Sequence, residues 1–209
     1  MQYFVIIWRL VIGILSFIGV QDILRHPADA VYFTYQSNIF LGIVMIWSAL
    51  AMIFKKLPAP HPWIKGSVLL FLIITASVAA LILPPDDPKT ATYVFTGVMA
   101  NDLLHRALPL AAAIDFLLFD RHRKYKISYA FTWLGYIFAY VIVILIRGHF
   151  FPHSGPRNGT NPYPYFFIDV SQLGYLQVFV NIIGLAVVFY LLGLFVFLVD
   201  KVLPEKMVL

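Results

Sequence analysis

Six stretches of the sequence are long and apolar enough to cross a membrane as helices, a length of about 20 residues each. They run from about residue 4 to 24, 30 to 54, 66 to 83, 97 to 119, 127 to 146 and 175 to 199. Their apolar residues are continuous, whereas the strands of a membrane barrel alternate apolar and polar residues. The sequence therefore predicts an all-α polytopic integral membrane protein. Residues 1–209 are expected to form one domain, a bundle of six transmembrane helices.

The composition indicates that lipid is much of the solvent. Hydrophobic residues make up 61% of the chain and charged residues 12%, while an average soluble domain carries about 25% charged residues. A net charge of +5 would favour a nucleic-acid partner in a soluble protein. Here the positive charges cluster in two short loops, so we expect no nucleic acid. The chain has no cysteine, which excludes disulfides and thiolate chemistry.

The two positive loops predict how the bundle is oriented, because Lys and Arg concentrate in cytoplasmic loops. The loop after the second stretch carries Lys55, Lys56 and Lys65, and the loop 120–126 carries four Lys or Arg residues. Both loops lie on one side of the predicted bundle, so both termini are expected to be cytoplasmic. In a bacterial host this would be a multi-pass protein of the inner membrane.

Strongly polar side chains inside the stretches converge near the non-cytoplasmic side. Thr34 lies about 6 Å into the second stretch and His105 about 12 Å into the fourth, at a rise of about 1.5 Å per residue. Thr34 and Asn38 are four residues apart, as are Asn101 and His105, so each helix presents a polar pair on one face. Because polar groups at membrane depth are costly, we expect these four to line a pocket that opens outward.

These residue types suit nucleophilic catalysis. A threonine hydroxyl becomes nucleophilic when a base accepts its proton, and a histidine titrates near neutrality and can act as that base. We therefore expect Thr34 as nucleophile and His105 as base in the hydrolysis of a lipid ester, without a metal or cofactor. The candidates for binding the oxyanion or orienting the imidazole are Asn38, Asn101, Arg147 and Asp169, with backbone N–H groups as further oxyanion donors. The alternative is structural, because Thr and Asn in membrane helices often only join neighbouring helices by hydrogen bonds.

The connector of residues 148–174 is longer than most loops. Loops beyond about 15 residues are usually functional or disordered, and the second half of this one is rich in Tyr, Phe and Pro. We interpret it as a lid over the outer mouth of the pocket, with Tyr163 and Tyr165 as substrate-binding residues. Asn181, early in the last stretch, faces the same region. The alternative is an interfacial belt of aromatic residues.

Two further groups of ionisable residues have structural explanations. Arg9 and Asp115 lie at similar depths near the cytoplasmic side, and we expect them to form a buried ion pair. His149 and His153 share the long connector, but no carboxylate or cysteine accompanies them at ligand spacing. We therefore expect no metal site there.

An ordered set of motifs resembles a family of bacterial six-helix membrane proteins over nearly the whole chain. The motifs are Tyr32–Asn38, His105–Pro109, Ile114–Phe119, Arg147-Gly148, Tyr163–Val170, Gly174-Tyr175 and Asn181. That family is similar, more distantly, to the eukaryotic androgen-induced and androgen-dependent membrane proteins. Those are multi-pass threonine hydrolases that cleave fatty acid esters of hydroxy fatty acids. The resemblance implies Thr34 as nucleophile, within Tyr-Phe-Thr-Tyr, and His105 as the catalytic histidine, between Asn101 and Pro109.

The sequence therefore predicts an intramembrane hydrolase of fatty acid esters, such as those of hydroxy fatty acids. Its partners would be membrane lipids and an acyl-chain substrate. The competing interpretation is a non-enzymatic protein that binds or carries lipids or other hydrophobic small molecules. A carrier typically shows repeat symmetry or broken helices around its site, and the sequence has no convincing internal repeat.

Overall fold

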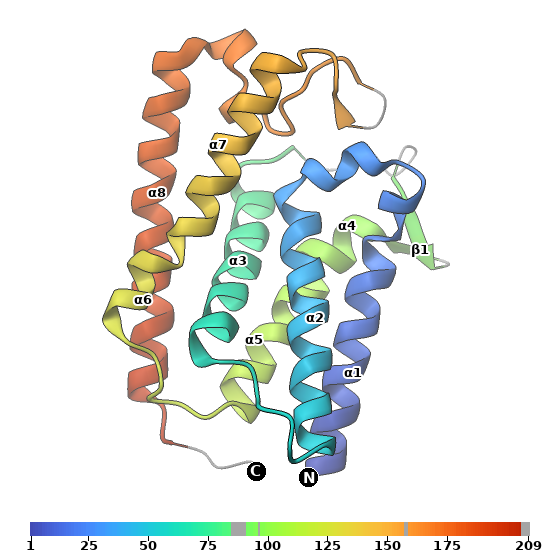
Figure 1. Ribbon diagram of the computed structural model, residues 1–209, viewed down its shortest axis with the longest axis vertical. Coiled ribbons are helices and arrows are strands. Elements are labelled where there is room, and N and C mark those ends of the chain that lie inside the picture. Colours follow the sequence, from blue (N-terminus) through green and yellow to red (C-terminus); the bar gives the residue numbers. More distant parts are fainter. Residues whose placement is uncertain (85–90, 96, 157–158, 206–209) are drawn as a thin grey trace.

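The protein is mostly helical, as the computed structural model in Figure 1 shows. The structure describes residues 1–84, 91–95, 97–156 and 159–205. The long helices run roughly along the longest axis of the molecule. The start of α1 and the end of α8 lie together at one end, which we call the termini end, and the opposite end is called the far end.

Five helical segments are long and apolar enough to cross a membrane, judged by length and composition. They are α1 (Gln2–Gly19), α2 (Phe33–Ile53), α3 (Pro62–Leu81), α6 with α7 (Ile127–Thr132 and Leu134–Phe150) and α8 (Val170–Val202). The shorter elements are η1 (Gln21–Leu24), η2 (Pro27–Val31), the antiparallel hairpin of β1 (Tyr93–Phe95) and β2 (Val98–Met99), α4 (Ala100–Asp102), η3 (Leu103–Ala107), α5 (Leu108–Phe119) and η5 (Phe166–Ile168). The five segments make the chain compatible with a membrane protein.

The fourth predicted stretch differs most from the expected single helix. The hairpin occupies its first residues, α4 begins at Ala100, and the π-helical turn η3 separates α4 from the twelve residues of α5. Pro109 explains the interruption, because proline has no N–H and its ring clashes with the carbonyl four residues earlier. The helix therefore widens into a π turn just before the proline. None of its pieces alone is long enough to count among the five segments.

The helix predicted from residue 175 begins five residues earlier. Asp169 caps α8, and its side chain accepts hydrogen bonds from the N–H groups of Ser171 and Gln172. Gly174 then interrupts the helix with φ of 73°, a left-handed conformation that glycine adopts without steric cost. The long connector is therefore shorter than predicted, and the part that the structure describes ends at the Asp169 cap; its residues 157–158 lie outside the described residues.

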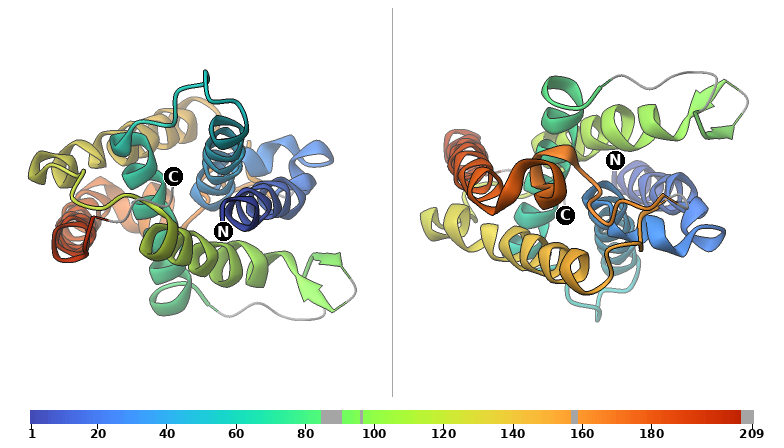
Figure 2. Two further views of the ribbon diagram at one scale, coloured as in Figure 1. Left: turned by 90° about the horizontal axis from the view of Figure 1, so that it is seen from below. Right: turned by 90° about the horizontal axis from the view of Figure 1, so that it is seen from above.

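Helix α3 lies at the centre of the bundle and contacts α2, α5 and α8 (Figure 2). Its start packs on Trp133, the fully buried residue between α6 and α7, whose indole N–H donates to the Trp63 carbonyl. A Cβ on Gly66 would lie 2.3 Å from the Trp133 ring. Only glycine fits at this position, and the close approach fixes α6 and α7 against α3.

The outward faces of α1, α7 and α8 are apolar and exposed. Examples are Ile7, Ile14, Ile142, Val143, Phe179, Val187, Leu191 and Phe195. Soluble monomers rarely expose apolar patches of more than a few hundred Å². The surface therefore agrees with the composition in suggesting a lipid environment for these helices.

A cluster of four charges, two buried and two half-buried, lies near the termini end. Arg9 donates from Nε to Asp115 at 2.9 Å and from Nη2 to Asp120 at 2.8 Å. Lys65 bonds Asp120 and lies 3.8 Å from the second oxygen of Asp115. The predicted pair of Arg9 and Asp115 is confirmed, while the part of Lys65 and Asp120 was not foreseen. We call these four residues the charge cluster.

Candidate active site

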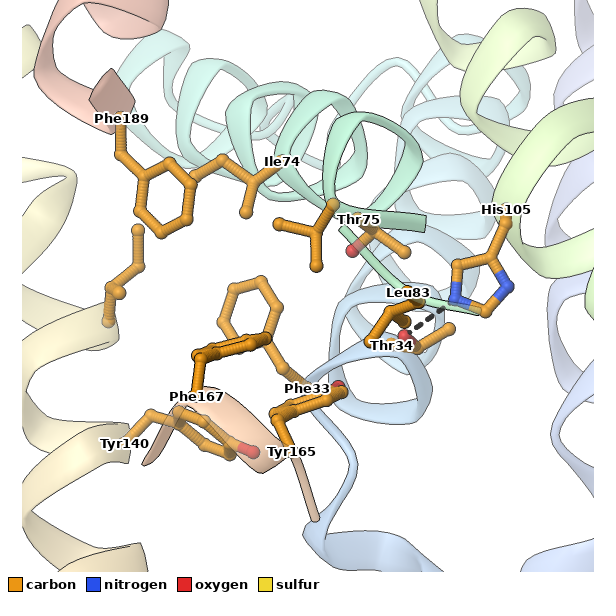
Figure 3. Close-up of a pocket in the computed structure, with 12 residues that line it drawn as sticks. Phe33, Thr34, Ile74, Thr75, Leu83, His105, Tyr140, Tyr165, Phe167 and Phe189 are labelled. Atoms are coloured by element: carbon orange, nitrogen blue, oxygen red, sulfur yellow. Dashed lines mark hydrogen bonds between the residues drawn. The ribbon is translucent and has the colours of Figure 1, made fainter. Parts of the chain in front are cut away.

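Thr34 and His105 are in hydrogen-bond contact. Thr34 is the second residue of α2, and His105 lies in the π turn between α4 and α5. The hydroxyl oxygen of Thr34 lies 3.0 Å from His105 Nε2, as Figure 3 shows. Sequence reasoning placed the two residues in one pocket, and the structure brings their side chains together.

The second ring nitrogen of His105 determines its tautomer. Nδ1 lies 3.2 Å from the backbone carbonyl oxygen of Asn101. A carbonyl can only accept, so Nδ1 carries the proton in this bond. In the neutral imidazole Nε2 is then unprotonated and accepts the hydrogen bond from the Thr34 hydroxyl. This is the arrangement that a general base needs in order to activate a hydroxyl nucleophile.

The π turn holds His105 in place and leaves one carbonyl to be satisfied from outside. The Leu108 N–H bonds the Leu103 carbonyl rather than that of Leu104, and Pro109 has no N–H to offer Leu104. The Asn38 amide donates to the Leu104 carbonyl at 3.4 Å and to the Thr34 carbonyl at 2.9 Å. Asn38 therefore ties the turn that carries the histidine to the helix that carries the threonine.

Tyr165 approaches the same threonine from the connector. Burial raises the pKa of Tyr165 to about 12, while hydrogen bonds with the side chain and backbone of Thr34 and with the backbone of Phe33 act in the opposite direction. The phenol is therefore protonated and a potential donor at neutral pH. Phe33 and Thr34 are the first two residues of α2, and N–H groups in the first turn of a helix have no partner within the helix.

An apolar cavity adjoins the pair. Phe33, Thr34, Ile74, Tyr140, Tyr165 and Phe189 are among its lining residues, and Figure 3 shows His105 at one side and Phe189 at the other. Apart from the pair, Thr75 and the two tyrosine hydroxyls, its walls are hydrocarbon. Such a cavity suits an acyl chain better than a polar metabolite.

Sequence reasoning missed the walls of this cavity on α7 and α8. Ile137, Tyr140 and Phe189 give no signal in one sequence, because an apolar residue that lines a cavity resembles one that faces lipid. The structure places Tyr140 inward, where its hydroxyl donates to the Val31 carbonyl.

Arg147 and Asp169 lie apart from the pair and organise the connector. The Arg147 guanidinium donates to the carbonyl of Pro162 at 2.9 Å and to that of Ser154. Asp169 is fully buried and, besides capping α8, accepts from the Asn161 amide at 2.5 Å. Each was predicted as a partner of the oxyanion or the imidazole, and the hydrogen bonds they make are with the connector and the start of α8.

The remaining predicted residues divide in the same way. Asn101 reaches His105 through its backbone carbonyl. The Asn181 amide donates to the Phe167 carbonyl at 2.9 Å and so fastens η5 to α8. Tyr163 packs on Gly148, where an added Cβ would lie 2.5 Å from its ring. Of the two predicted tyrosines, Tyr165 lines the cavity and Tyr163 braces the connector.

His149 and His153 are both exposed. Within the described ranges, no group of three or more His, Asp or Glu side chains is placed to hold a metal ion.

The chain matches no family model, no curated protein and no solved structure in sequence and structure comparisons. The function is therefore inferred from the geometry of the site and from the sequence motifs.

Proposed function

We propose that this protein is an intramembrane threonine hydrolase that cleaves carboxylic esters of fatty acids, including esters of hydroxy fatty acids. The observation that carries the proposal is the 3.0 Å contact between the Thr34 hydroxyl and His105 Nε2, next to an apolar cavity. A purely structural threonine in a membrane helix needs only the carbonyl of a preceding turn as its partner. A histidine whose tautomer leaves Nε2 as acceptor is a more specific partner for a nucleophile.

The proposed reaction has two steps. His105 Nε2 accepts the Thr34 proton while the hydroxyl oxygen attacks the ester carbonyl carbon, and the tetrahedral intermediate expels the alcohol, which takes the proton from Nε2. Water then attacks the acyl-threonine ester, giving one proton to His105 and its oxygen to the acyl carbon. Thr34 recovers its proton from His105, and the fatty acid leaves.

The negative charge of the intermediate needs hydrogen-bond donors that are already in position. The first N–H groups of α2 and the Tyr165 hydroxyl, which bonds Thr34, are donors at the nucleophile. Both are better placed than Arg147, which bonds the connector. Asn38 has a supporting role in this proposal, because its amide already bonds two carbonyls.

We further propose six membrane crossings, with α4, η3 and α5 together as the fourth. A continuous helix over Ala100–Phe119 would be about 30 Å long, enough for the hydrocarbon core. The Lys- and Arg-rich loops lie at the termini end (Figure 1), and the positive-inside tendency would make that end cytoplasmic. The Thr34 site would then face the non-cytoplasmic side.

Covalent labelling tests the nucleophile. A fluorophosphonate probe with an alkyl tail should label the purified protein on Thr34, and Thr34→Ala should abolish both the labelling and the release of fatty acid from a fluorogenic ester. Ser48→Ala is the matched control, because Ser48 is another buried hydroxyl of α2 whose bond goes to the carbonyl four residues earlier. Labelling and hydrolysis that persist in Thr34→Ala would falsify the proposal, and lipid binding without labelling would favour the carrier.

The absence of cysteine offers a direct test of orientation. Single cysteines placed at Lys55 or Lys124 should react with a membrane-impermeant maleimide only after the membrane is opened. A cysteine at His153, an exposed residue of the long connector, should react in intact cells. The reverse pattern would show that the proposed orientation is wrong.

A further inference from the structure

His105 stands between two cavities that differ in width and polarity. The first is the apolar cavity that contains Thr34, with a volume of about 50 Å³. The second is a groove of about 790 Å³ between the far end of α3 and the segment of α4, η3 and α5. His105 and Leu83 line both, whereas Thr34 lines only the first and Asn101 only the second.

A third cavity lies beside the apolar cavity, on the side away from His105. Ile137, Phe167 and Phe189 also line this third cavity, between α7 and α8 beneath η5, so these side chains form the partition between the two. All the residues that line the third cavity are apolar, and its own volume is again about 50 Å³. We call the two narrow cavities together the acyl slot.

The groove is of another kind. Its walls combine the small residues of α3, such as Ala76 and Ala80, with polar groups of the segment opposite. Arg106 and Asp102 form an ion pair of 2.6 Å at its rim, with side chains 81% and 40% exposed. The groove is open to the surroundings of the protein. Its volume is more than ten times that of either part of the slot.

The chemistry of the proposed reaction assigns one half of an ester to each space. The proton that His105 takes from Thr34 must be delivered to the leaving oxygen, so this oxygen has to lie beside the imidazole. An unbranched acyl chain fits a narrow apolar slot, and the alcohol half then extends past the imidazole into the groove. We propose that the site divides its substrate at His105, with the acyl chain in the slot and the alcohol half in the groove.

This inference rests on the proposed hydrolase function and adds where each half of the ester lies. A long unbranched acyl chain and a bulky alcohol are accommodated in different spaces on the two sides of His105. The slot selects substrates by the length of the acyl chain, and the groove selects them by the size of the alcohol. The two preferences therefore depend on different residues. The end of the slot far from His105 is lined by α7, η5 and α8, and the groove lies between α3 and the segment of α4, η3 and α5.

Two substitutions separate the two halves. Ala186 lines the slot on α8 and Ala80 lines the groove on α3. Ala186→Trp should lower the preference for hexadecanoyl over butanoyl esters by about tenfold, whichever alcohol they carry. Ala80→Trp should lower the preference for a long secondary alcohol over methanol by about tenfold, whichever acyl chain is present. About tenfold or more is the usual effect of filling or emptying a hydrophobic pocket.

The readout is the ratio of kcat/KM values over this matrix of esters in purified protein. Val187→Trp and Leu81→Trp are matched controls, because these neighbours are 55% and 84% exposed and line neither space. Ala186→Phe and Ala80→Phe make the same comparison with less added volume should a tryptophan variant not fold.

The division at His105 is overturned if the Ala186 variant changes the alcohol preference and the Ala80 variant changes the acyl preference. It is also overturned if both variants keep the ratios of the controls. Either result leaves the hydrolase function intact. Absence of Thr34-dependent hydrolysis of every ester in the matrix overturns both. The expected result is that each variant shifts one ratio and leaves the other unchanged.

Discussion

The two ends of the bundle bury polar groups in opposite ways. At the termini end, Arg9, Lys65, Asp115 and Asp120 form a cluster of two positive and two negative side chains that neutralise one another. At the far end, Thr34 and His105 share one hydrogen bond beside an open cavity. The first arrangement pairs its charges with one another, and the second leaves a hydroxyl and an imidazole facing a cavity.

This difference separates structural from functional polarity in a membrane bundle. Buried charges that are fully paired satisfy each other, and removing one leaves its partners uncompensated. Buried groups that face a cavity contribute little to stability, but they can act on a molecule that enters. Substitutions at the far end should therefore change activity without unfolding the protein, and substitutions in the charge cluster should do the reverse.

The largest expected effect is the loss of activity in His105→Gln. Glutamine retains a polar side chain of similar reach but cannot accept and return a proton, and general base catalysis contributes about 10²–10⁴-fold. We expect ester hydrolysis to fall by about 10³-fold, while the midpoint of thermal unfolding in detergent stays close to that of the wild type. His26→Gln changes an exposed histidine and serves as the control. Equal activity of the two variants would remove His105 from the mechanism.

In the charge cluster, Arg9→Ala should lower the free energy of unfolding rather than the activity. It leaves Asp115 buried beside a single lysine, and breaking a buried pair costs about 3–5 kcal/mol. Chemical denaturation would measure this loss, and the folded fraction should hydrolyse esters at the wild-type rate. Arg9→Met combined with Asp115→Leu removes one charge of each sign and should recover most of the stability. A double variant as unstable as Arg9→Ala would mean that the cluster acts through more than charge balance.

Asn38 connects the two helices of the site and should show an intermediate effect. Asn38→Leu leaves the Leu104 carbonyl without its amide donor, and a buried unsatisfied group costs about 1–3 kcal/mol. The π turn should then hold His105 less firmly, so kcat should fall while Thr34 remains reactive toward the probe. Ser37→Ala, which removes a bond to the carbonyl four residues earlier and a long contact of 3.5 Å from the Thr75 hydroxyl, is the comparison. A larger loss of kcat in Ser37→Ala would contradict this role.

The smallest expected effect concerns the Asp169 cap, whose pKa gives it a pH dependence. Burial alone would raise the pKa of Asp169, but hydrogen bonds from Ser171, Asn161 and Gln172 together hold it below the usual 3.8. A carboxylate with a lower pKa in the folded state stabilises above the unfolded value, and this contribution disappears as pH falls through the folded value. Hydrogen exchange at the start of α8 should therefore accelerate as pH falls below about 4, relative to Asp169→Asn.

Asp169→Ala should cost about 1 kcal/mol at neutral pH, the usual cost of removing a helix cap. Asp169→Asn should cost less there, because asparagine also caps helices. An identical pH response of wild type and Asp169→Asn would show that the carboxylate does not supply the dependence.

The sequence was most informative about the apolar segments, in which polar residues are rare. Continuous apolar runs predicted five long helical segments correctly, because hydropathy averages over many residues. The depth of Thr34 and His105 predicted their proximity, since few polar groups compete for an interior position. The ion pair of Arg9 and Asp115 was predicted by the same reasoning.

The predictions that failed were those that depend on backbone geometry and on nearby hydrogen-bond partners. Hydropathy does not register the π turn before Pro109, because the residues on both sides of it are apolar. Arg147 and Asp169 were assigned to the pair by depth, whereas backbone carbonyls and N–H groups near them in the chain bind them first. Lys65 was interpreted only as a cytoplasmic marker, although its long side chain reaches back to the buried carboxylates.

The π turn also limits which insertions and deletions the lineage of this protein could tolerate. An α-helix advances about 100° per residue, and a π turn accommodates one residue more than an α-helical turn. Deleting one residue from Leu103–Ala107 would restore a regular helix but rotate everything before it by about that angle relative to α5. His105 and Asn101 would then turn away from Thr34. The chain would still be apolar enough to insert into a membrane. Among distant sequences, the length of this short interval should therefore indicate whether the residues at the positions of Thr34 and His105 can meet.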